Sequence, residues 1–185
     1  MGEGTKYDVE IQNVVAVATL NQSIDLISIM KVFRNVEYRP KKFPGLVFRL
    51  KRPKTATLIF TTGKMVCTGA KSSKMARSAV MRVVQELKKA AFIIKGKPEI
   101  IITNVVATAN VGKEVDLEAA AEVLGNIMYE PEQFPGAVYR MKEPKVVILI
   151  FRSGKLVITG AKRKEQVHEA IEKMASILTE NELVY

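Results

Sequence analysis

The sequence contains one pattern twice, 91 residues apart, and this duplication constrains the fold more than any other feature. Residues 11–16 (IQNVVA) return as residues 102–107 (ITNVVA), and Phe43-Pro44-Gly45 returns as Phe134-Pro135-Gly136. From position 11 to position 87 no gap is needed, and 32 of these 77 positions are identical in both copies, far more than chance would produce. A chain duplicated in this way folds most simply into two similar halves about a pseudo-two-fold axis.

Each copy carries the signals of a small unit of strands and helices. In the first copy, the residue pattern predicts strands over 9–20, 36–40, 46–51, 55–61 and 64–69. It also predicts helices over 25–35 and 72–90, with Ser72 as the N-cap of the second. The short connections that carry Gly or Pro favour antiparallel pairing. Two copies therefore predict an α+β fold of about ten strands and four helices.

Composition places the chain among globular proteins and narrows its chemistry. An apolar share of 48% suits a packed core, no apolar run approaches a membrane span, and the N-terminus lacks a signal sequence. Cys67 and His168 are the only residues of their types, which excludes an internal disulfide and an ordinary zinc site and fits a reducing compartment. The net charge of +10 attracts polyanions, nucleic acids among them.

The predicted strands are largely apolar on both faces, although each unit has only two helices to cover them. Asn13, Val15 and Val17 alternate with Val14 and the alanines that follow it, and the later strands alternate in the same way. Helices of this kind cover one face of a sheet, so the other face is expected to be a broad apolar surface for binding. The alternatives are a sheet closed into a barrel and two chains stacked face to face.

Four phenylalanines repeat in pairs: Phe43 with Phe60, and Phe134 with Phe151. Phe43 and Phe134 lie in Pro- and Gly-bearing loops, where a core residue is less expected, whereas Phe33, Phe48 and Phe92 are interpreted as core residues because none is a phenylalanine in both copies. The basic residues that repeat lie near strand ends, around the rim of the apolar face. A cationic rim around an apolar floor suits the sugars, base edges and phosphates of a nucleic-acid groove, although each single cation also suits ordinary solvent exposure.

Motifs of catalysis and of cofactor binding are missing. The Gly-Lys pairs at 63–64 and 154–155 lack the earlier glycine of a phosphate-binding loop, because Leu58 and Leu149 stand there. The lone His168 lies on a face of a helix that is expected to be exposed. We therefore expect no enzyme activity, no cofactor and no metal.

The motif Phe-Pro-Gly…Arg-x-Lys-x-Pro-Lys…Leu-Ile-Phe-x-x-Gly-Lys-x-Val-x-Thr-Gly-Ala-Lys occurs twice and closely resembles the core of the TATA-box-binding proteins over residues 7–181. The sequence has no long N-terminal extension, and in this it resembles the archaeal form of the family more than the eukaryotic one. The resemblance implies two repeats, 1–92 and 93–185, in one saddle-shaped domain, whose curved ten-stranded antiparallel sheet carries four helices on its convex face. It also implies a general transcription factor that binds A·T-rich TATA elements in the minor groove.

The resemblance further implies residue roles. Phe43, Phe60, Phe134 and Phe151 wedge between base pairs and kink the DNA. The groove floor and base edges meet Asn13, Val15, Val17, Leu58, Val66, Thr68, Asn104, Val106, Thr108, Leu149, Val157 and Thr159. One position departs from the pattern, because Val17 stands where eukaryotic members often carry threonine, as its mate Thr108 does. The phosphate contacts implied are Arg49, Lys64, Arg140 and Lys155, to which we add the repeated cations Lys51, Lys71, Lys142 and Lys162.

The two halves differ in charge, which predicts a direction for partner binding. Residues 1–91 carry 17 basic and 6 acidic side chains, whereas residues 92–185 carry 12 and 13, giving net charges of +11 and −1. Glu130 and Glu132 replace Arg39 and Lys41 beside the second loop phenylalanine. This acidic loop is interpreted as the docking point for transcription factor B, the partner that the resemblance implies.

The partners expected are double-stranded TATA DNA, transcription factor B, the RNA polymerase pre-initiation complex and, for the free chain, a weak homodimer; no membrane is expected. The location expected is the cytoplasm, at the nucleoid, or the nucleus for a eukaryotic source. The competing functions are a sheet that binds RNA through its aromatic residues and a module that binds a small ligand. RNA-binding sheets place aromatic residues at strand centres, whereas the phenylalanines here lie toward strand ends.

Overall fold

The structure, a computed structural model, describes residues 6–185 as ten strands and four helices. The first copy supplies β1 (Glu10–Thr19), α1 (Leu26–Val32), β2 (Val36–Glu37), β3 (Leu46–Lys51), β4 (Lys54–Ile59), β5 (Lys64–Ala70) and α2 (Ser73–Lys89). The second copy supplies β6 (Glu99–Asn110), α3 (Leu117–Val123), β7 (Ile127–Met128), β8 (Ala137–Met141), β9 (Val146–Ile150), β10 (Lys155–Ala161) and α4 (Lys164–Glu180). The predicted order of elements is confirmed, but the strand expected over 36–40 is only two residues long.

The strands form one sheet in the order β2-β3-β4-β5-β1-β6-β10-β9-β8-β7, which reads the same from either end once the two copies are exchanged. Antiparallel pairing joins the strands of each copy. The predicted α+β class, with ten antiparallel strands and four helices, is therefore confirmed. No helix within residues 6–185 is long and apolar enough to cross a membrane.

The chain divides into two compact units that do not coincide with the two copies. One unit is Asn13–Thr103; the other joins Asn104–Tyr185 to the residues up to Gln12. In this second unit the Asn110 amide donates to the Tyr7 carbonyl at 2.8 Å, and the Gln12 side-chain amide donates to the Thr108 hydroxyl at 3.1 Å. Each unit is therefore completed by a segment of the other copy. The boundary predicted at residue 92 separates the two sequence repeats, whereas the compact units divide at Gln12 and Thr103.

Local signals explain where the helices begin. The Asp25 carboxylate accepts the backbone N–H of Ser28, and the Asp116 carboxylate accepts that of Ala119, so α1 and α3 start at equivalent caps. The predicted cap at Ser72 is confirmed, because its hydroxyl accepts the Met75 N–H at 3.0 Å. The equivalent residue at the start of α4 is Arg163, which makes no side-chain cap.

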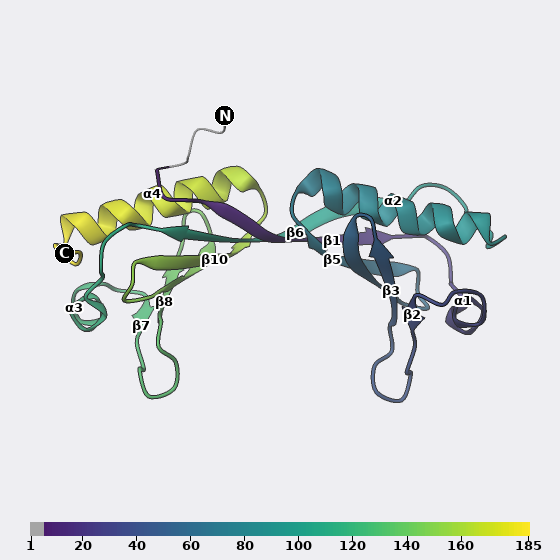
Figure 1. The fold of residues 1–185 in the computed structure, drawn as a ribbon, viewed down its shortest axis with the longest axis horizontal. Helices are drawn as coiled ribbons and strands as arrows, with labels where there is room; N and C mark the ends of the chain where they lie inside the picture. Colours follow the sequence, from purple (N-terminus) through teal and green to yellow (C-terminus); the bar gives the residue numbers. More distant parts are fainter. Residues whose placement is uncertain (1–5) are drawn as a thin grey trace. The chain divides into compact units, whose positions relative to one another are not determined.

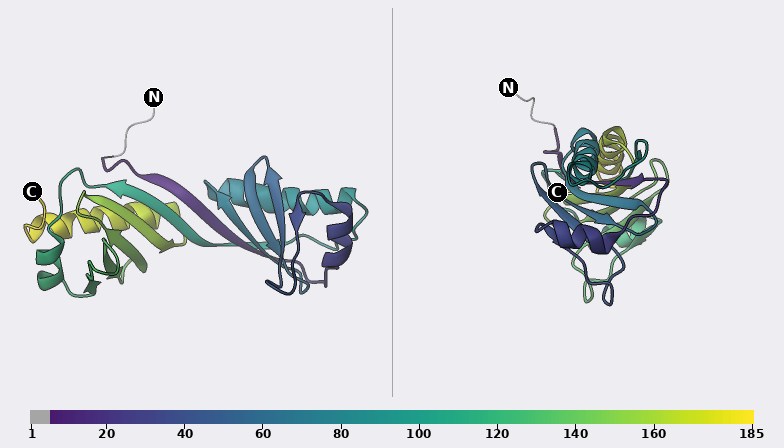
Figure 2. Two further views of the ribbon diagram at one scale, coloured as in Figure 1. Left: turned by 60° about the horizontal axis from the view of Figure 1, so that its bottom comes forward. Right: turned by 90° about the vertical axis from the view of Figure 1, so that its right-hand side faces the viewer.

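The core of each unit lies between the long helix and one face of its strands (Figures 1 and 2). In the first unit, the sheet side of this core contains the fully buried Ala16, Met65 and Cys67, and α2 faces it with Ala79 and Val83. Full burial of a side chain as large as Met65 or Val83 stabilises the fold by about 1.5–3 kcal/mol. Figure 1 also shows that the loop between β2 and β3 projects away from α2, as the β7–β8 loop projects away from α4.

Of the three phenylalanines interpreted as core residues, only Phe48 is fully buried. The Phe33 ring meets it edge-on with centroids 5.0 Å apart, and the Phe92 ring stacks on Phe33 at 6.3 Å. Phe33 and Phe92 are half-buried because they follow the ends of α1 and α2, at the margin of the core.

One buried hydroxyl in the first unit is poorly satisfied. Among residues 6–185, the Thr57 hydroxyl oxygen has no hydrogen-bond partner other than the weakly polar thiol of Cys67, whose pKa is raised by burial. The equivalent pair in the second copy is Ile148 and Ile158, both fully buried.

We expect Thr57→Val to raise the free energy of unfolding by about 1 kcal/mol, because it removes an unsatisfied hydroxyl while keeping the shape of the side chain. Urea denaturation measures this change. Thr55→Val is the matched control: the Thr55 hydroxyl donates to the Pro53 carbonyl at 3.2 Å, so its loss should destabilise the protein. A lower unfolding free energy for Thr57→Val would show that this hydroxyl is satisfied.

Candidate nucleic-acid interface

Within residues 6–185, no helix covers the strand face opposite the long helix of either unit, and we call this face the open face. Along β1, fully buried Val14, Ala16 and Ala18 alternate with half-exposed Asn13, Val15 and Val17. The same alternation continues through β4 and β5, and it recurs in the second unit. The predicted apolar surface without a covering layer is therefore present in each unit, and cross-strand pairing arranges it in three rows.

The middle row of the open face is apolar. In the first unit Val17 pairs with Val66, Val66 with Leu58, and Leu58 with Val47. The second unit repeats this row as Thr108, Val157, Leu149 and Val138. The rows differ in kind only at Val17 and Thr108, which is the asymmetry visible in the sequence.

The row on one side of it carries the polar groups. In the first unit it contains Asn13, Thr68, Ala56 and, at the β3 edge, Arg49. The Asn13 side-chain oxygen accepts the Gly69 N–H at 2.7 Å, and its nitrogen donates to the Thr68 hydroxyl at 3.0 Å.

A β-bulge produces the Asn13 contact. The β1–β5 register shifts between Val14 and Ala16, and Gly69, with φ of +99°, turns its N–H out of the ladder. Because the backbone occupies the amide oxygen, Asn13 presents nitrogen to the open face, where one N–H remains for a ligand.

The second unit repeats the polar row. Its members are Asn104, Thr159, Val147 and Arg140. The Asn104 side-chain oxygen accepts the Gly160 N–H at 2.8 Å, and its nitrogen lies 3.4 Å from the Thr159 hydroxyl. The remaining predicted floor residues, Val15 and Val106, are half-exposed next to these bulges.

The third row, on the other side of the apolar one, is aromatic. The Phe43 and Phe60 rings meet edge to face with centroids 5.9 Å apart, and the Phe134 and Phe151 rings meet at 5.8 Å. A Cβ atom on Gly45 would lie 2.8 Å from the Phe43 ring and 3.1 Å from the Phe60 ring, so a glycine is needed beneath the pair. The structure thus brings together each phenylalanine pair that the sequence matched.

Exposed cations stand at the positions predicted for phosphate contacts. All eight candidate phosphate contacts are exposed: Arg49, Lys51, Lys64, Lys71, Arg140, Lys142, Lys155 and Lys162. Arg49 lies 3.6 Å from the Glu37 carboxylate, a contact that solvent screens. In the second unit Arg140, Lys142 and Lys162, together with Lys145, line a hollow of about 920 Å³ that also reaches Thr159.

The acidic loop has the same backbone as its basic counterpart. The Gln133 and Phe134 amides donate to the Glu130 carbonyl, as the Lys42 and Phe43 amides donate to the Arg39 carbonyl. Arg39 is paired with Glu37 at 3.2 Å, but the residue equivalent to Glu37 is Met128, which is exposed. Within residues 6–185, neither Glu130 nor Glu132 takes part in an ion pair, so both carboxylates face solvent.

Two residues of the open face were missed in the sequence analysis. Val47 and Val138 are half-exposed and lie at the ends of the two apolar rows. They are equivalent positions, so the same residue type stands there in both copies. That identity, together with strand alternation, could have identified them. No cluster of three or more His, Cys, Asp or Glu side chains that could hold a metal occurs among the described residues.

The fold and the site define a class: duplicated α+β proteins whose open sheet face carries paired aromatic residues and a cationic rim. A family model described as "Transcription factor TFIID (or TATA-binding protein, TBP)" matches residues 8–90 and 99–181. The chain belongs to this family of transcription factors, which confirms that it is not an enzyme.

Archaeal relatives are similar along nearly the whole chain. The TATA-box-binding protein of Sulfolobus acidocaldarius is 53% identical over 97% of this chain and 91% of its own. That of Methanothermobacter thermautotrophicus is 49% identical over 97% of this chain and 99% of its own. The solved structure titled "Methanococcus jannaschii TBP" has a TM-score of 0.85 and 47% identity, covering 93% of this chain and 98% of that one.

Proposed function

We propose that this protein binds A·T-rich TATA elements of double-stranded DNA from the minor groove, kinks the DNA and thereby marks promoters for transcription. The observation that carries the proposal is the three-row open face present in each unit. An apolar row lies between a row with an amide donor and a row with an edge-to-face phenylalanine pair. The relatives' names point to the same element.

The chemistry of the rows matches the minor groove of A·T pairs. That groove presents only hydrogen-bond acceptors at A·T pairs, whereas G·C pairs add an amino donor. The free N–H groups of Asn13 and Asn104 suit such acceptors. The row of valine and leucine side chains offers no acceptor to the amino group that a G·C pair projects into the groove. Selectivity for A·T pairs follows from this combination.

The phenylalanine pairs supply the kink. A ring inserted between base pairs costs a few kcal/mol of unstacking, least at flexible TA steps, and the bent DNA then contacts more protein surface. Phe43 and Phe134 are the more exposed ring of each pair, at 43% and 38%. Phe60 and Phe151 follow the ends of β4 and β9 and complete each wedge, because their rings meet those of Phe43 and Phe134 edge to face.

Fluorescence anisotropy with three labelled ligands tests the proposal: a TATA duplex, a GC duplex of equal length, and the TATA strand alone as RNA. We expect the TATA duplex to bind at least about a hundredfold more tightly than the GC duplex, because several mismatched pairs cost about 1–3 kcal/mol each. Equal binding of both duplexes would contradict the proposal of A·T-selective binding in the minor groove. Preference for the single strand would instead support an RNA-binding sheet.

We further propose that the DNA-bound protein recruits transcription factor B through Glu130 and Glu132, and through it RNA polymerase. The support is an acidic loop without internal ion pairs beside Phe134, in the half of net charge −1. Such charges set specificity and association rate more than raw affinity. The protein then acts at the nucleoid, and when DNA is absent the open face suits a weak homodimer.

We expect Glu130→Lys with Glu132→Lys to leave TATA binding intact or slightly stronger and to weaken the ternary complex with transcription factor B about tenfold or more. Gel shifts with the double variant, TATA DNA and the partner measure both steps. The matched control is Arg39→Glu with Lys41→Glu in the equivalent loop, which should leave the ternary complex unchanged. A wild-type ternary complex with the glutamate variant would exclude this loop as the docking site.

A further inference from the structure

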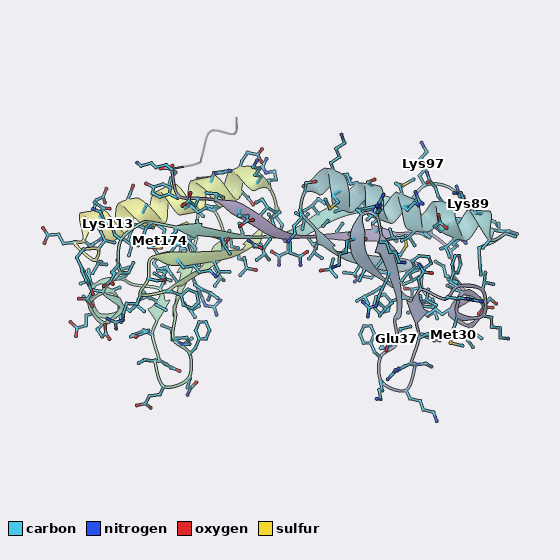
Figure 3. All side chains as sticks on the ribbon, viewed as in Figure 1. Met30, Glu37, Lys89, Lys97, Lys113 and Met174 are labelled. Atoms are coloured by element: carbon cyan, nitrogen blue, oxygen red, sulfur yellow. The ribbon has the colours of Figure 1, made fainter. Side chains whose placement is uncertain are left out.

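Helix α1 exposes large apolar side chains beside cations. Ile27 and Met30, one turn apart on the same side of α1, are 53% and 41% exposed, and Lys31 follows Met30. Val32 is 56% exposed, and Arg34 lies just beyond the end of the helix. Figure 3 shows Met30 on α1, with its side chain outside the core. We call Ile27, Met30, Lys31 and Arg34 the α1 face.

The segment after α2 extends this surface. The Ile93 carbonyl accepts the Gln22 side-chain amide at 2.8 Å, and the Lys95 amide donates to the Gln22 oxygen at 2.7 Å. The stacking of Phe92 on Phe33 fixes the segment against the end of α1. Ile93 is 78% exposed, so an apolar residue that the fold does not use stands close to the α1 face.

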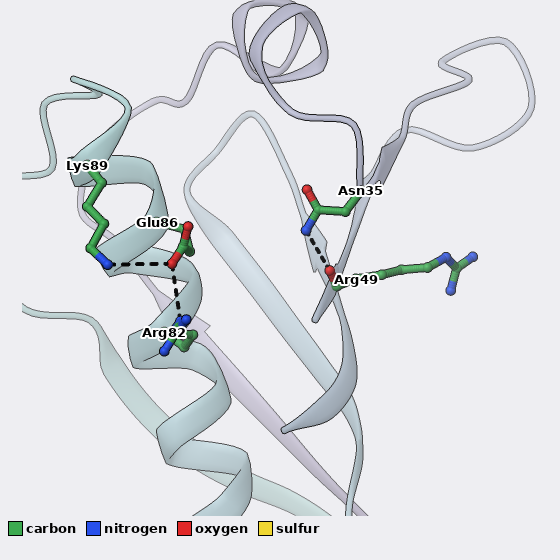
Figure 4. A network of polar contacts seen from close by, with 5 residues as sticks. All are labelled: Asn35, Arg49, Arg82, Glu86 and Lys89. Atoms are coloured by element: carbon green, nitrogen blue, oxygen red, sulfur yellow. Dashed lines mark hydrogen bonds and ion pairs between the residues drawn. The ribbon is translucent and has the colours of Figure 1, made fainter. Parts of the chain in front are cut away.

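Asp25 and Glu86 do not neutralise the α1 face, and Glu37 is paired with Arg39 and Arg49. The Asp25 carboxylate caps α1 and accepts the Ser28 hydroxyl, although Lys31 also interacts with its charge. Glu86 lies between Arg82 and Lys89, at 3.2 and 3.9 Å (Figure 4). Within residues 6–185, neither Lys31 nor Arg34 is in an ion pair.

The duplication supplies an internal control for what folding requires. The buried and capping positions of α1 are kept in α3: Leu26 is matched by Leu117, and Asp25 by Asp116. The α1 face, in contrast, is replaced in full, because its four counterparts are Glu118, Ala121, Glu122 and Gly125. The scaffold therefore tolerates a small, acidic surface at this place, and the fold does not require the apolar and basic side chains of the α1 face.

We propose that the α1 face is a docking site for an acidic amphipathic segment of a protein partner. Ile27 and Met30 provide the apolar contact, and methionine adapts to differently shaped partners. Lys31 and Arg34 pair with carboxylates and set the specificity. A nucleic-acid phosphate would use the cations but leave the large apolar side chains without a role. None of these residues belongs to the open face, so the site is independent of the proposed DNA binding.

The test uses the full chain and a labelled synthetic helical peptide with Asp and Glu on one side and Leu and Phe on the other. Fluorescence anisotropy at low salt compares the wild type, Met30→Ser with Lys31→Glu on α1, and the matched Ala121→Ser with Glu122→Lys on α3. We expect the α1 variant to weaken peptide binding about tenfold or more and the α3 variant to leave it unchanged. Thermal melting confirms that both variants are folded.

Four results would overturn the proposal. The first is equal peptide affinity for the α1 variant and the wild type. The second is equal affinity for a control peptide with Asn and Gln in place of Asp and Glu. The third is a dimer in sedimentation that the α1 variant abolishes, which would assign the α1 face to a second copy of the chain. Saturating TATA duplex should leave peptide binding intact, and displacement of the peptide would place it on the open face instead.

Discussion

DNA bound by the double variant Phe60→Ala with Phe151→Ala should remain nearly straight, although the protein folds. Each ring contributes about 1–3 kcal/mol of contact with a base, so losing two should weaken TATA binding about a hundredfold. The cost to stability is small in comparison, because both rings are half-buried and the pairs that they form with Phe43 and Phe134 are worth about 0.5–1.5 kcal/mol each.

Energy transfer between dyes at the two ends of the DNA measures bending, and circular dichroism melting measures stability. Phe48→Leu is the control, because Phe48 is fully buried in the same unit. It should lower the unfolding free energy by about 1 kcal/mol or more and leave the bending of bound DNA unchanged. The opposite pattern, in which the double variant melts early yet still bends DNA, would assign Phe60 and Phe151 to the core.

The affinity for the TATA duplex should fall steeply as monovalent salt is added. If at least four of the eight rim cations contact phosphates, the plot of log affinity against log salt has a slope of about −4 or steeper. Between 50 and 200 mM, such a slope weakens binding by roughly two hundredfold or more. The net charge of +10 fits a protein that works at ordinary salt, where this relation holds.

A matched pair of variants tests whether the rim carries this effect. Lys64→Gln with Lys155→Gln should make the slope shallower by about 2, because each lost phosphate contact removes about 0.9. Lys74→Gln, on the helix side of the first unit, should leave the slope unchanged. A wild-type slope near zero would contradict phosphate contacts altogether and favour an apolar ligand.

Repetition made much of the architecture predictable. Alternation in residues 9–20 and 64–69 identified which side chains share a face, because that property depends only on local backbone geometry. The pairs Phe43 with Phe60 and Phe134 with Phe151 followed from the constant offset. The overlong strand prediction at 36–40 failed because the chain turns after Glu37, where the Phe43 amide donates to the Arg39 carbonyl.

Features that depend on the register between paired strands could not be predicted from the sequence. The bulge at Gly69, which commits the Asn13 oxygen to the backbone, requires knowledge of which residues of β1 and β5 are opposite each other. The contact of Gly45 with two rings depends on the path of a loop that no periodic pattern describes. The interpretation of Phe92 as core was incomplete for the same reason, because the path after α2 decides its burial.

The exchange of chain between the two units makes the two copies depend on each other. The unit built on the second copy needs the residues up to Gln12 from the first, where the Tyr7 carbonyl accepts the Asn110 amide. If the chain were cut between the two copies, the second copy would lose its covalent link to this segment, and the two pieces would have to associate to restore the unit. One continuous polypeptide therefore turns an association that would depend on concentration into one that does not.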